Sequence, residues 1–189
     1  MRLTLLLCAL PVAVLAQPAD SLDLKSKLLF HVDAIASPWS LAGSAAYAGL
    51  LQEVDAPTEW GQGAGAYGKR FVSTMGSVGI YAALGFALDS TLHQDPRYFR
   101  SRRPGFWHRT AHALRGTILT RTDRGGETLS IWRLGSSYGA AFLSNQWYPG
   151  RLNTVSLGVA QGSLTAGLGL VRNLGSEFWP DIRRKLLRR

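Results

Sequence analysis

Cysteine is nearly absent from this sequence, because Cys8 is the only one among 189 residues. It lies in an N-terminal segment that we expect to be removed, so the mature chain would contain no thiol. That absence excludes disulfide bonds, cysteine-ligated zinc and a cysteine nucleophile. A chain of this length buries a core without such cross-links. We therefore expect one domain with no structural metal of the cysteine type.

Acidic residues are also few, and they are unevenly distributed. The chain has 12 Asp/Glu against 21 Lys/Arg, a net charge of +9. Residues 17–96 carry four Lys/Arg and eight Asp/Glu, a balance of −4, whereas residues 97–189 carry sixteen and four, a balance of +12. Of the 21 basic residues 17 are arginine, which suits bidentate contacts to phosphate or carboxylate. The basic half indicates an anionic partner, and the alternative is that its arginines pair with acids of the same chain.

The N-terminal segment MRLTLLLCALPVAVLAQPADS has the three parts of a signal peptide. Arg2 supplies the positive charge, residues 3–15 are apolar, and Val14 and Ala16 occupy the −3 and −1 positions before Gln17. The apolar run of about 13 residues is shorter than the roughly 20 that span a membrane. We predict that residues 1–16 are a signal peptide and that 17–189 form a single mainly helical domain. The expected location is the periplasm or the outer membrane.

Four uncharged stretches of about 17–20 residues raise the question of membrane-spanning helices. They are residues 34–52, 71–88, 134–150 and 152–171. Polar residues such as Asn145 and Gln161 weaken this interpretation. Spanning helices in an exported chain would also place the arginine-rich segment 89–133 outside, against the positive-inside rule. The sequence leaves peripheral and integral attachment as alternatives.

The hydrophobic periodicity of these stretches fits helices better than strands. Val78 and Ile80 alternate as in a barrel strand until the pattern breaks at Ala82, and Val155, Leu157 and Val159 alternate until it breaks at Gln161. We predict a mainly α fold, a compact bundle of about five to six Gly/Ala-rich helices, with an outer-membrane β-barrel or small pore as the alternative. The expected helices span residues 24–36, 38–53 and 67–91, a fourth beginning at Pro104, two on either side of a turn at 145–153, and a short basic tail helix beginning at Pro180. Residues 121–130 are expected to form a loop.

Motifs of enzymes and cofactor sites are incomplete in this chain. The glycines of residues 63–68 have dinucleotide-binding spacing but follow no strand signal. His108 and His112 have the spacing of metal ligands but enclose Arg109 and lack a third ligand. No G-x-S-x-G motif is present. We predict no metal, no cofactor, no catalytic residue and a non-enzymatic protein, with a hydrolase of wall or lipid substrates as the alternative.

The segment HQDPRYFRSRRPGFW, residues 93–107, interleaves arginines with aromatic rings. Export separates this segment from nucleic acid. Arginine beside tryptophan and tyrosine suits an interface that is anionic on one side and apolar on the other. We predict that the basic half binds anionic lipid or an envelope polymer; a homo-oligomer is also allowed, and no nucleic acid is expected. The predicted anion- or lipid-binding residues are Lys69, Arg70, Arg97, Arg100, Arg102, Arg103, Arg109, Arg121, Arg183, Arg184 and Lys185. The predicted interface aromatics are Tyr98, Phe99, Phe106, Trp107 and Trp179.

Four segments occur in the order WGQGAGAYGKRF, STLHQDPRYFR, ILTRTDRGGETLS and EFWPDIRRK, covering most of the chain from Trp60 to Lys185. In this combination the chain resembles a family of exported bacterial proteins to which no activity is assigned. The resemblance implies export and a single domain, and it implies no catalytic residue. It directs attention to Tyr67, Lys69, Arg70, Asp95, Arg97, Tyr98, Arg121, Asp123, Trp179 and Asp181.

Overall fold

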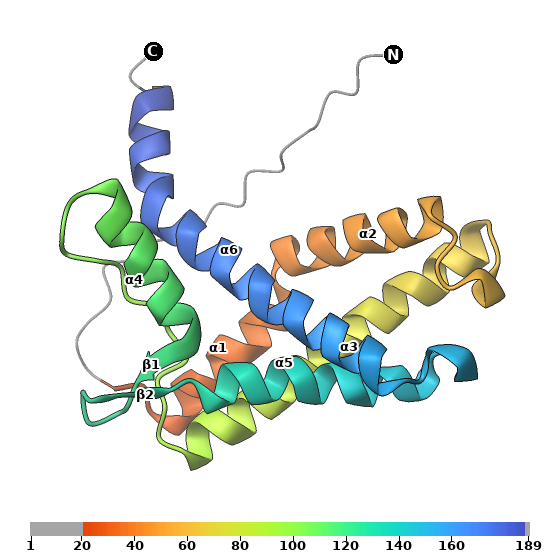
Figure 1. Ribbon diagram of the computed structural model, residues 1–189, viewed down its shortest axis with the longest axis horizontal. Helices are drawn as coiled ribbons and strands as arrows, with labels where there is room; N and C mark the ends of the chain where they lie inside the picture. Colours follow the sequence, from red (N-terminus) through yellow and green to blue (C-terminus); the bar gives the residue numbers. More distant parts are fainter. Residues whose placement is uncertain (1–20, 188–189) are drawn as a thin grey trace.

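The computed structural model describes residues 21–187 of the chain, and the predicted signal peptide, residues 1–16, lies outside them. Six α-helices make up most of the described part (Figure 1). They are α1 (Leu24–Ala36), α2 (Pro38–Glu53), α3 (Ala64–Thr91), α4 (Phe106–Ile118), α5 (Ile131–Ser144) and α6 (Val155–Leu187). The prediction of a mainly α helical bundle is confirmed, and residues 21–187 form no barrel, because their only strands are two of three residues each.

Local sequence explains the boundaries of the first two helices, which lie where the sequence predicts them. The Asp23 carboxylate accepts a hydrogen bond of 2.8 Å from the Ser26 amide and caps α1. Ser37 ends α1, and its hydroxyl accepts a 3.2 Å bond from the Ser40 amide at the start of α2. Pro38 suits the first position of α2 because a backbone N–H at that position would have no acceptor within the helix, so its absence in proline costs nothing.

Four other boundaries differ from the prediction. Helix α3 begins at Ala64, three residues early, and α4 begins at Phe106 after Gly105, whose φ of 104° favours glycine. Residues 121–130 are not a simple loop, because β1 (Leu119–Arg121) pairs antiparallel with β2 (Glu127–Leu129). Pro180 does not begin a separate tail helix, because α6 continues through it to Leu187. Arg109 of α4 binds the carboxylates on both sides of Pro180, at Glu177 and Asp181, which supports this continuity.

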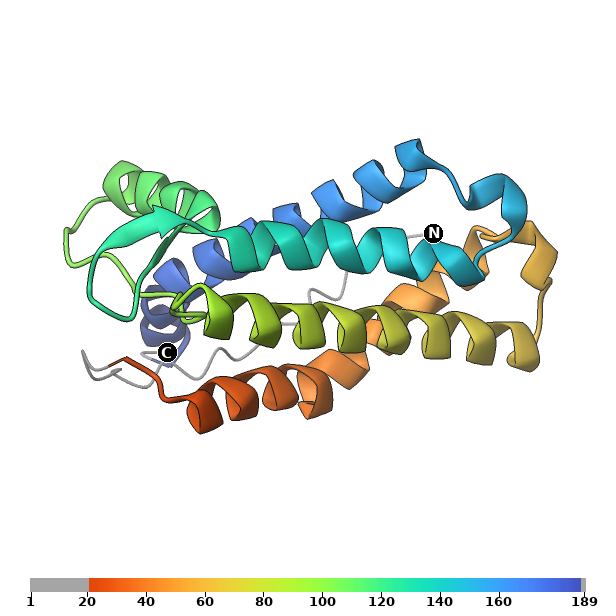
Figure 2. The ribbon, with the colours of Figure 1, turned by 90° about the horizontal axis from the view of Figure 1, so that it is seen from below.

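Helices α3 and α5 lie side by side, and α6 packs on α5 before it passes α4 (Figures 1 and 2). Small residues permit these close approaches. Gly162 of α6 lies against the ring of Tyr138 on α5, where a Cβ atom would come within 2.9 Å of both Cγ and Cε1. Glycine is therefore required at this crossing for steric reasons rather than for its backbone conformation.

Substitution Gly162→Ala is expected to lower the free energy of unfolding by about 1–3 kcal/mol, because the added methyl group overpacks the contact with Tyr138. The matched control is Gly167→Ala in the same helix, where a Cβ atom meets nothing within 4 Å. That control is expected to raise stability by roughly 0.4–1 kcal/mol through reduced entropy of the unfolded chain. Chemical denaturation of both variants measures the difference, and equal effects would contradict the packing argument.

The distribution of polar and apolar residues is inverted relative to an ordinary soluble domain. Within residues 21–187 the buried apolar residues are alanines and Trp132. Charged side chains are buried instead, namely Lys27, Arg70, Asp89, Asp95, Arg97, Arg133 and Glu177. Large apolar side chains lie on the outside of every helix, for example Leu29, Leu50, Val72, Trp107, Leu143 and Leu168. Most large apolar surface is therefore left without a partner within the described chain.

Candidate functional site

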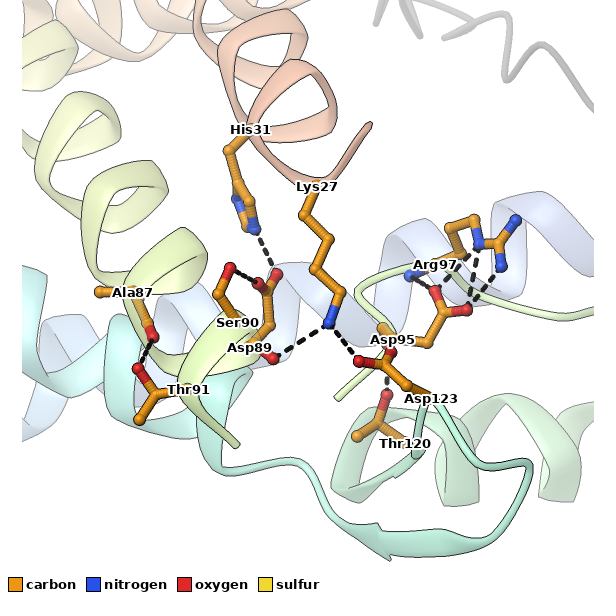
Figure 3. A network of polar contacts seen from close by, with 10 residues as sticks. All are labelled: Lys27, His31, Ala87, Asp89, Ser90, Thr91, Asp95, Arg97, Thr120 and Asp123. Carbon is orange, nitrogen blue, oxygen red and sulfur yellow. Dashed lines mark hydrogen bonds and ion pairs between the residues drawn. The ribbon is translucent and has the colours of Figure 1, made fainter. Parts of the chain in front are cut away.

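Polar side chains concentrate where the end of α3, the hairpin β1–β2, α4 and the second half of α6 meet, at the left of Figure 1. The first group links α1 to this region (Figure 3). Lys27 Nζ donates to Asp123 Oδ2 at 2.8 Å and to the Asp89 carbonyl at 3.2 Å. One turn further along α1, His31 Nε2 lies 2.6 Å from Asp89 Oδ2. Both basic side chains are almost fully buried, so each needs its carboxylate partner.

The second group fixes the segment 93–98 against the hairpin. The Asp95 amide donates to the Arg121 carbonyl at 2.8 Å, and the Thr120 hydroxyl donates to the Asp95 carbonyl at 2.7 Å. The Asp95 carboxylate accepts two bonds from the Arg97 guanidinium, of 2.9 Å from Nε and 2.6 Å from Nη2 (Figure 3). Arg97 is thus held in one orientation by a bidentate pair.

The third group surrounds Glu177, which is fully buried in α6. Its Oε1 accepts hydrogen bonds from the Tyr98 hydroxyl at 2.8 Å and the Ser101 amide at 2.7 Å, and its Oε2 accepts one from Arg109 Nε at 3.2 Å. Arg100 Nη2 donates to the Glu177 carbonyl at 3.0 Å. These bonds fasten the arginine-rich segment to α6.

Two pKa values reflect this third group. Burial, and then the hydrogen bond to Glu177, raise the pKa of Tyr98 above its ordinary value of 10.0, so the phenol stays protonated and can donate. A hydrogen bond from Arg109 lowers the pKa of Asp181 below its ordinary value of 3.8, so this carboxylate is charged at neutral pH. Tyr98, which fastens the segment before α4 to α6, and Asp181, which bonds Arg109 of α4, are therefore in the protonation states that their hydrogen bonds require.

A small cavity of about 50 Å³ opens beside these groups, and we call it the arginine–aromatic cavity. Its lining residues are Arg97, Tyr98, Phe99, His112, Arg115, Gly116, Leu119, Thr120, Arg121 and Glu127. The Phe99 ring lies near both the Arg97 and the Arg121 guanidinium carbons, at 5.2 and 4.2 Å from its centroid. His112 Nε2 lies 2.8 Å from the Phe99 carbonyl and donates to it, which fixes the backbone at this point.

A larger cavity of about 240 Å³ lies beside the first group, between the start of α1 and the hairpin turn. It is lined by Leu22, Leu24, Lys27, Ser90, His93 and Asp123. Asp123 Oδ1 is buried there and accepts no hydrogen bond from the part of the chain that the structure describes. The larger cavity therefore adjoins the first polar group and none of the predicted anion-binding arginines.

Of the predicted site residues, the arginine–aromatic cavity brings together Arg97, Tyr98, Phe99 and Arg121. Arg100 and Arg109 lie next to it but bond to Glu177. The residues Arg102, Arg103, Phe106, Trp107, Arg183, Arg184 and Lys185 are exposed around this end of the molecule, and Trp179 is half-buried. Lys69 and Arg70 do not join the site, because they lie near the other end of α3, about 29 Å from Asp89 by helix rise.

Sequence reasoning missed several residues of this region. Lys27, His31 and Asp89 gave no signal, because Lys27 and Asp123 are 96 residues apart and His31 and Asp89 are 58 apart. His112 was noticed only for its spacing from His108, and the structure uses it to bond Phe99. Within residues 21–187 no group of three or more His, Cys, Asp or Glu side chains is placed to hold a metal ion.

Comparison of the chain with family models, with curated proteins and with solved structures gives no match. The resemblance in the four sequence segments therefore stays a prediction.

Proposed function

We propose that this protein is a non-enzymatic component of the cell envelope that associates with an anionic membrane. Its outward apolar side chains contact lipid, and its arginine-rich end contacts phosphate-bearing headgroups. The observation that carries the proposal is the inverted distribution of residues, with charged side chains inside and large apolar side chains outside. Small residues between helices and polar groups directed inward are typical of proteins in contact with lipid.

Helix α3 supports contact with the hydrocarbon region. Among the described helices it is the one that is long and apolar enough to cross a membrane, with 28 residues. Only 17% of its most apolar 18-residue window is buried within the molecule, whereas a core helix of a soluble protein would be mostly buried. The uncharged segment 71–88 is also about 27 Å long, close to the roughly 30 Å of a bilayer core.

The arginine-rich end supports contact with headgroups. Helix α4 turns Trp107, Leu114 and Ile118 outward, with 78% of the Trp107 surface exposed, and its opposite side packs Ala113 inward. Trp107, Ala111, Leu114 and Ile118 recur at helical spacing on one face of α4, and all four are exposed, so this apolar face points away from the molecule rather than toward its core. Exposed tryptophan beside arginine is typical of the boundary between lipid and water.

The test is fractionation of cells that express the full-length chain, followed by washes of the membrane fraction. We expect the protein in the membrane fraction, and we expect high salt to leave most of it there, because salt screens charge contacts but not apolar ones. A subsequent alkaline carbonate wash separates peripheral from integral attachment. Recovery in the soluble fraction would contradict the proposal, and complete release by salt would contradict the apolar contact.

A further inference from the structure

We infer that the arginine–aromatic cavity binds the phosphate group of a lipid headgroup. The inference rests on the proposed membrane association and names its ligand. The shared chemistry is a phosphate oxyanion, which a lipid headgroup or free inorganic phosphate can present. Four features of the cavity support a phosphate ligand: the charge of its lining, the fixed orientation of its side chains, its volume and the apolar residues at its rim.

The charge of the lining favours an anion. Arg97, Arg115 and Arg121 line the cavity together with the acidic Glu127, while Asp95 outside the lining pairs with Arg97, so the arginines exceed the nearby carboxylates by one. Arg115 Nη2 bonds Glu127 Oε2 at 2.5 Å, but both side chains are exposed at the rim. An exposed pair of this kind contributes little to stability, so a phosphate can compete with Glu127 for Arg115.

Arg121 has no anionic partner among residues 21–187. Its guanidinium group forms no hydrogen bond or ion pair with any residue in the range 21–187, and it is held 4.2 Å above the Phe99 ring. Stacking on an aromatic face limits the orientations of a guanidinium while leaving its N–H groups directed outward. Arg121 is thus ordered for planar recognition of an oxyanion.

Arg97 supplies a second, buried element of the site. Only 8% of its surface is exposed, the pair with Asp95 fixes its plane, and its guanidinium carbon lies 5.2 Å from the centroid of the Phe99 ring. One buried and one accessible arginine thus lie near the same ring, and their orientations are fixed, unlike those of scattered cations on a surface. The contacts with Asp95 and Phe99 hold the two guanidinium groups in place, so binding would cost little ordering of side chains.

The size and the rim of the cavity limit the ligand. A volume of about 50 Å³ is several times the roughly 10–15 Å³ that one water needs, so the cavity admits a small group and not a whole sugar or base. Leu119 lines it, and the adjacent Ile118 and the paired Leu129 are exposed. When the phosphate of a phospholipid enters the cavity, the acyl chains on its glycerol therefore meet apolar surface outside. This favours a lipid over free phosphate as the ligand.

The experiment compares Arg121→Gln with Arg124→Gln, an exposed arginine of the hairpin turn that does not line the cavity. Both variants lose one positive charge. Purified full-length protein is titrated with soluble dihexanoyl phosphatidic acid and with inorganic phosphate, and is floated with vesicles of phosphatidylcholine with and without phosphatidic acid. We expect Arg121→Gln to weaken binding of the short-chain phosphatidic acid at least about tenfold and Arg124→Gln less than about twofold.

Equal weakening by the two variants would show that only total charge matters and would overturn the site. Unchanged binding by Arg121→Gln would overturn it as well. Inorganic phosphate that binds as tightly as the short-chain lipid would overturn the lipid as its source. Arg121→Lys should restore only part of the affinity, because a point charge replaces the planar guanidinium.

Failure of this inference is distinguishable from failure of membrane association. If the wild-type protein floats with neutral vesicles but gains nothing from phosphatidic acid, the apolar contact stands and the phosphate site is wrong. If the protein floats with neither kind of vesicle, the proposed association itself is wrong.

Discussion

Replacing Arg70 by alanine is expected to lower the free energy of unfolding by about 3–5 kcal/mol, because the residue is a buried charge with a full set of partners. Arg70 is fully buried near the start of α3. Its guanidinium donates to the carbonyls of Ala56, Pro57 and Gly61 at 2.8, 3.1 and 2.9 Å. It also bonds Gln52 Oε1 at 2.6 Å. One side chain thus holds the segment that connects α2 to α3.

The matched control is Lys69→Ala, which removes a neighbouring cation that is exposed. This change is expected to alter stability by no more than about 0.5 kcal/mol. Arg70→Lys should recover little of the loss, because an ammonium group does not span three carbonyls in one plane. Denaturant unfolding of the three variants in detergent micelles gives the comparison. Similarly small changes in the free energy of unfolding at positions 69 and 70 would contradict a structural role for Arg70. They would favour the sequence-based prediction that it binds lipid.

Replacing Glu177 by alanine is expected to cost a similar amount, about 3–5 kcal/mol, because it leaves buried donors without an acceptor. Tyr98, Ser101 and Arg109 all donate to this carboxylate. Tyr98 and the neighbouring Phe99 line the arginine–aromatic cavity, so we also expect the variant to lose its preference for phosphatidic acid. The vesicle flotation assay and denaturant unfolding measure the two effects on one protein sample.

Glu127→Ala is the control for Glu177, since its ion pair with Arg115 is exposed at the cavity rim. Its expected cost in stability is below about 1 kcal/mol. Because Glu127 competes for Arg115, its removal should strengthen binding of phosphatidic acid rather than weaken it. A loss of stability at Glu127 equal to that at Glu177 would contradict the distinction between buried and exposed pairs.

Local signals in the sequence were sufficient for much of the secondary structure. Helices α1 and α2 were predicted with their observed bounds, and the structure shows that Asp23 and Ser37 fix these ends through bonds that reach only three residues. The prediction was wrong at Pro180, where a proline ordinarily interrupts a helix. Arg109 of α4 bonds Glu177 and Asp181 on either side of this proline. These partners lie 68 and 72 residues from Arg109 in the sequence, so no local pattern encodes the contacts.

By itself the sequence determined the helical fold class, the position of the uncharged stretches and the asymmetry of charge, because each depends on residue type and short-range spacing. Only the tertiary structure decided the role of each arginine. Arg70 beside Lys69, and Arg121 beside Arg124, look equivalent in the sequence, yet the first pair differs in burial and the second in access to a cavity. The physical reason is that a buried charge requires partners, and those partners come from distant segments that meet only when the chain folds.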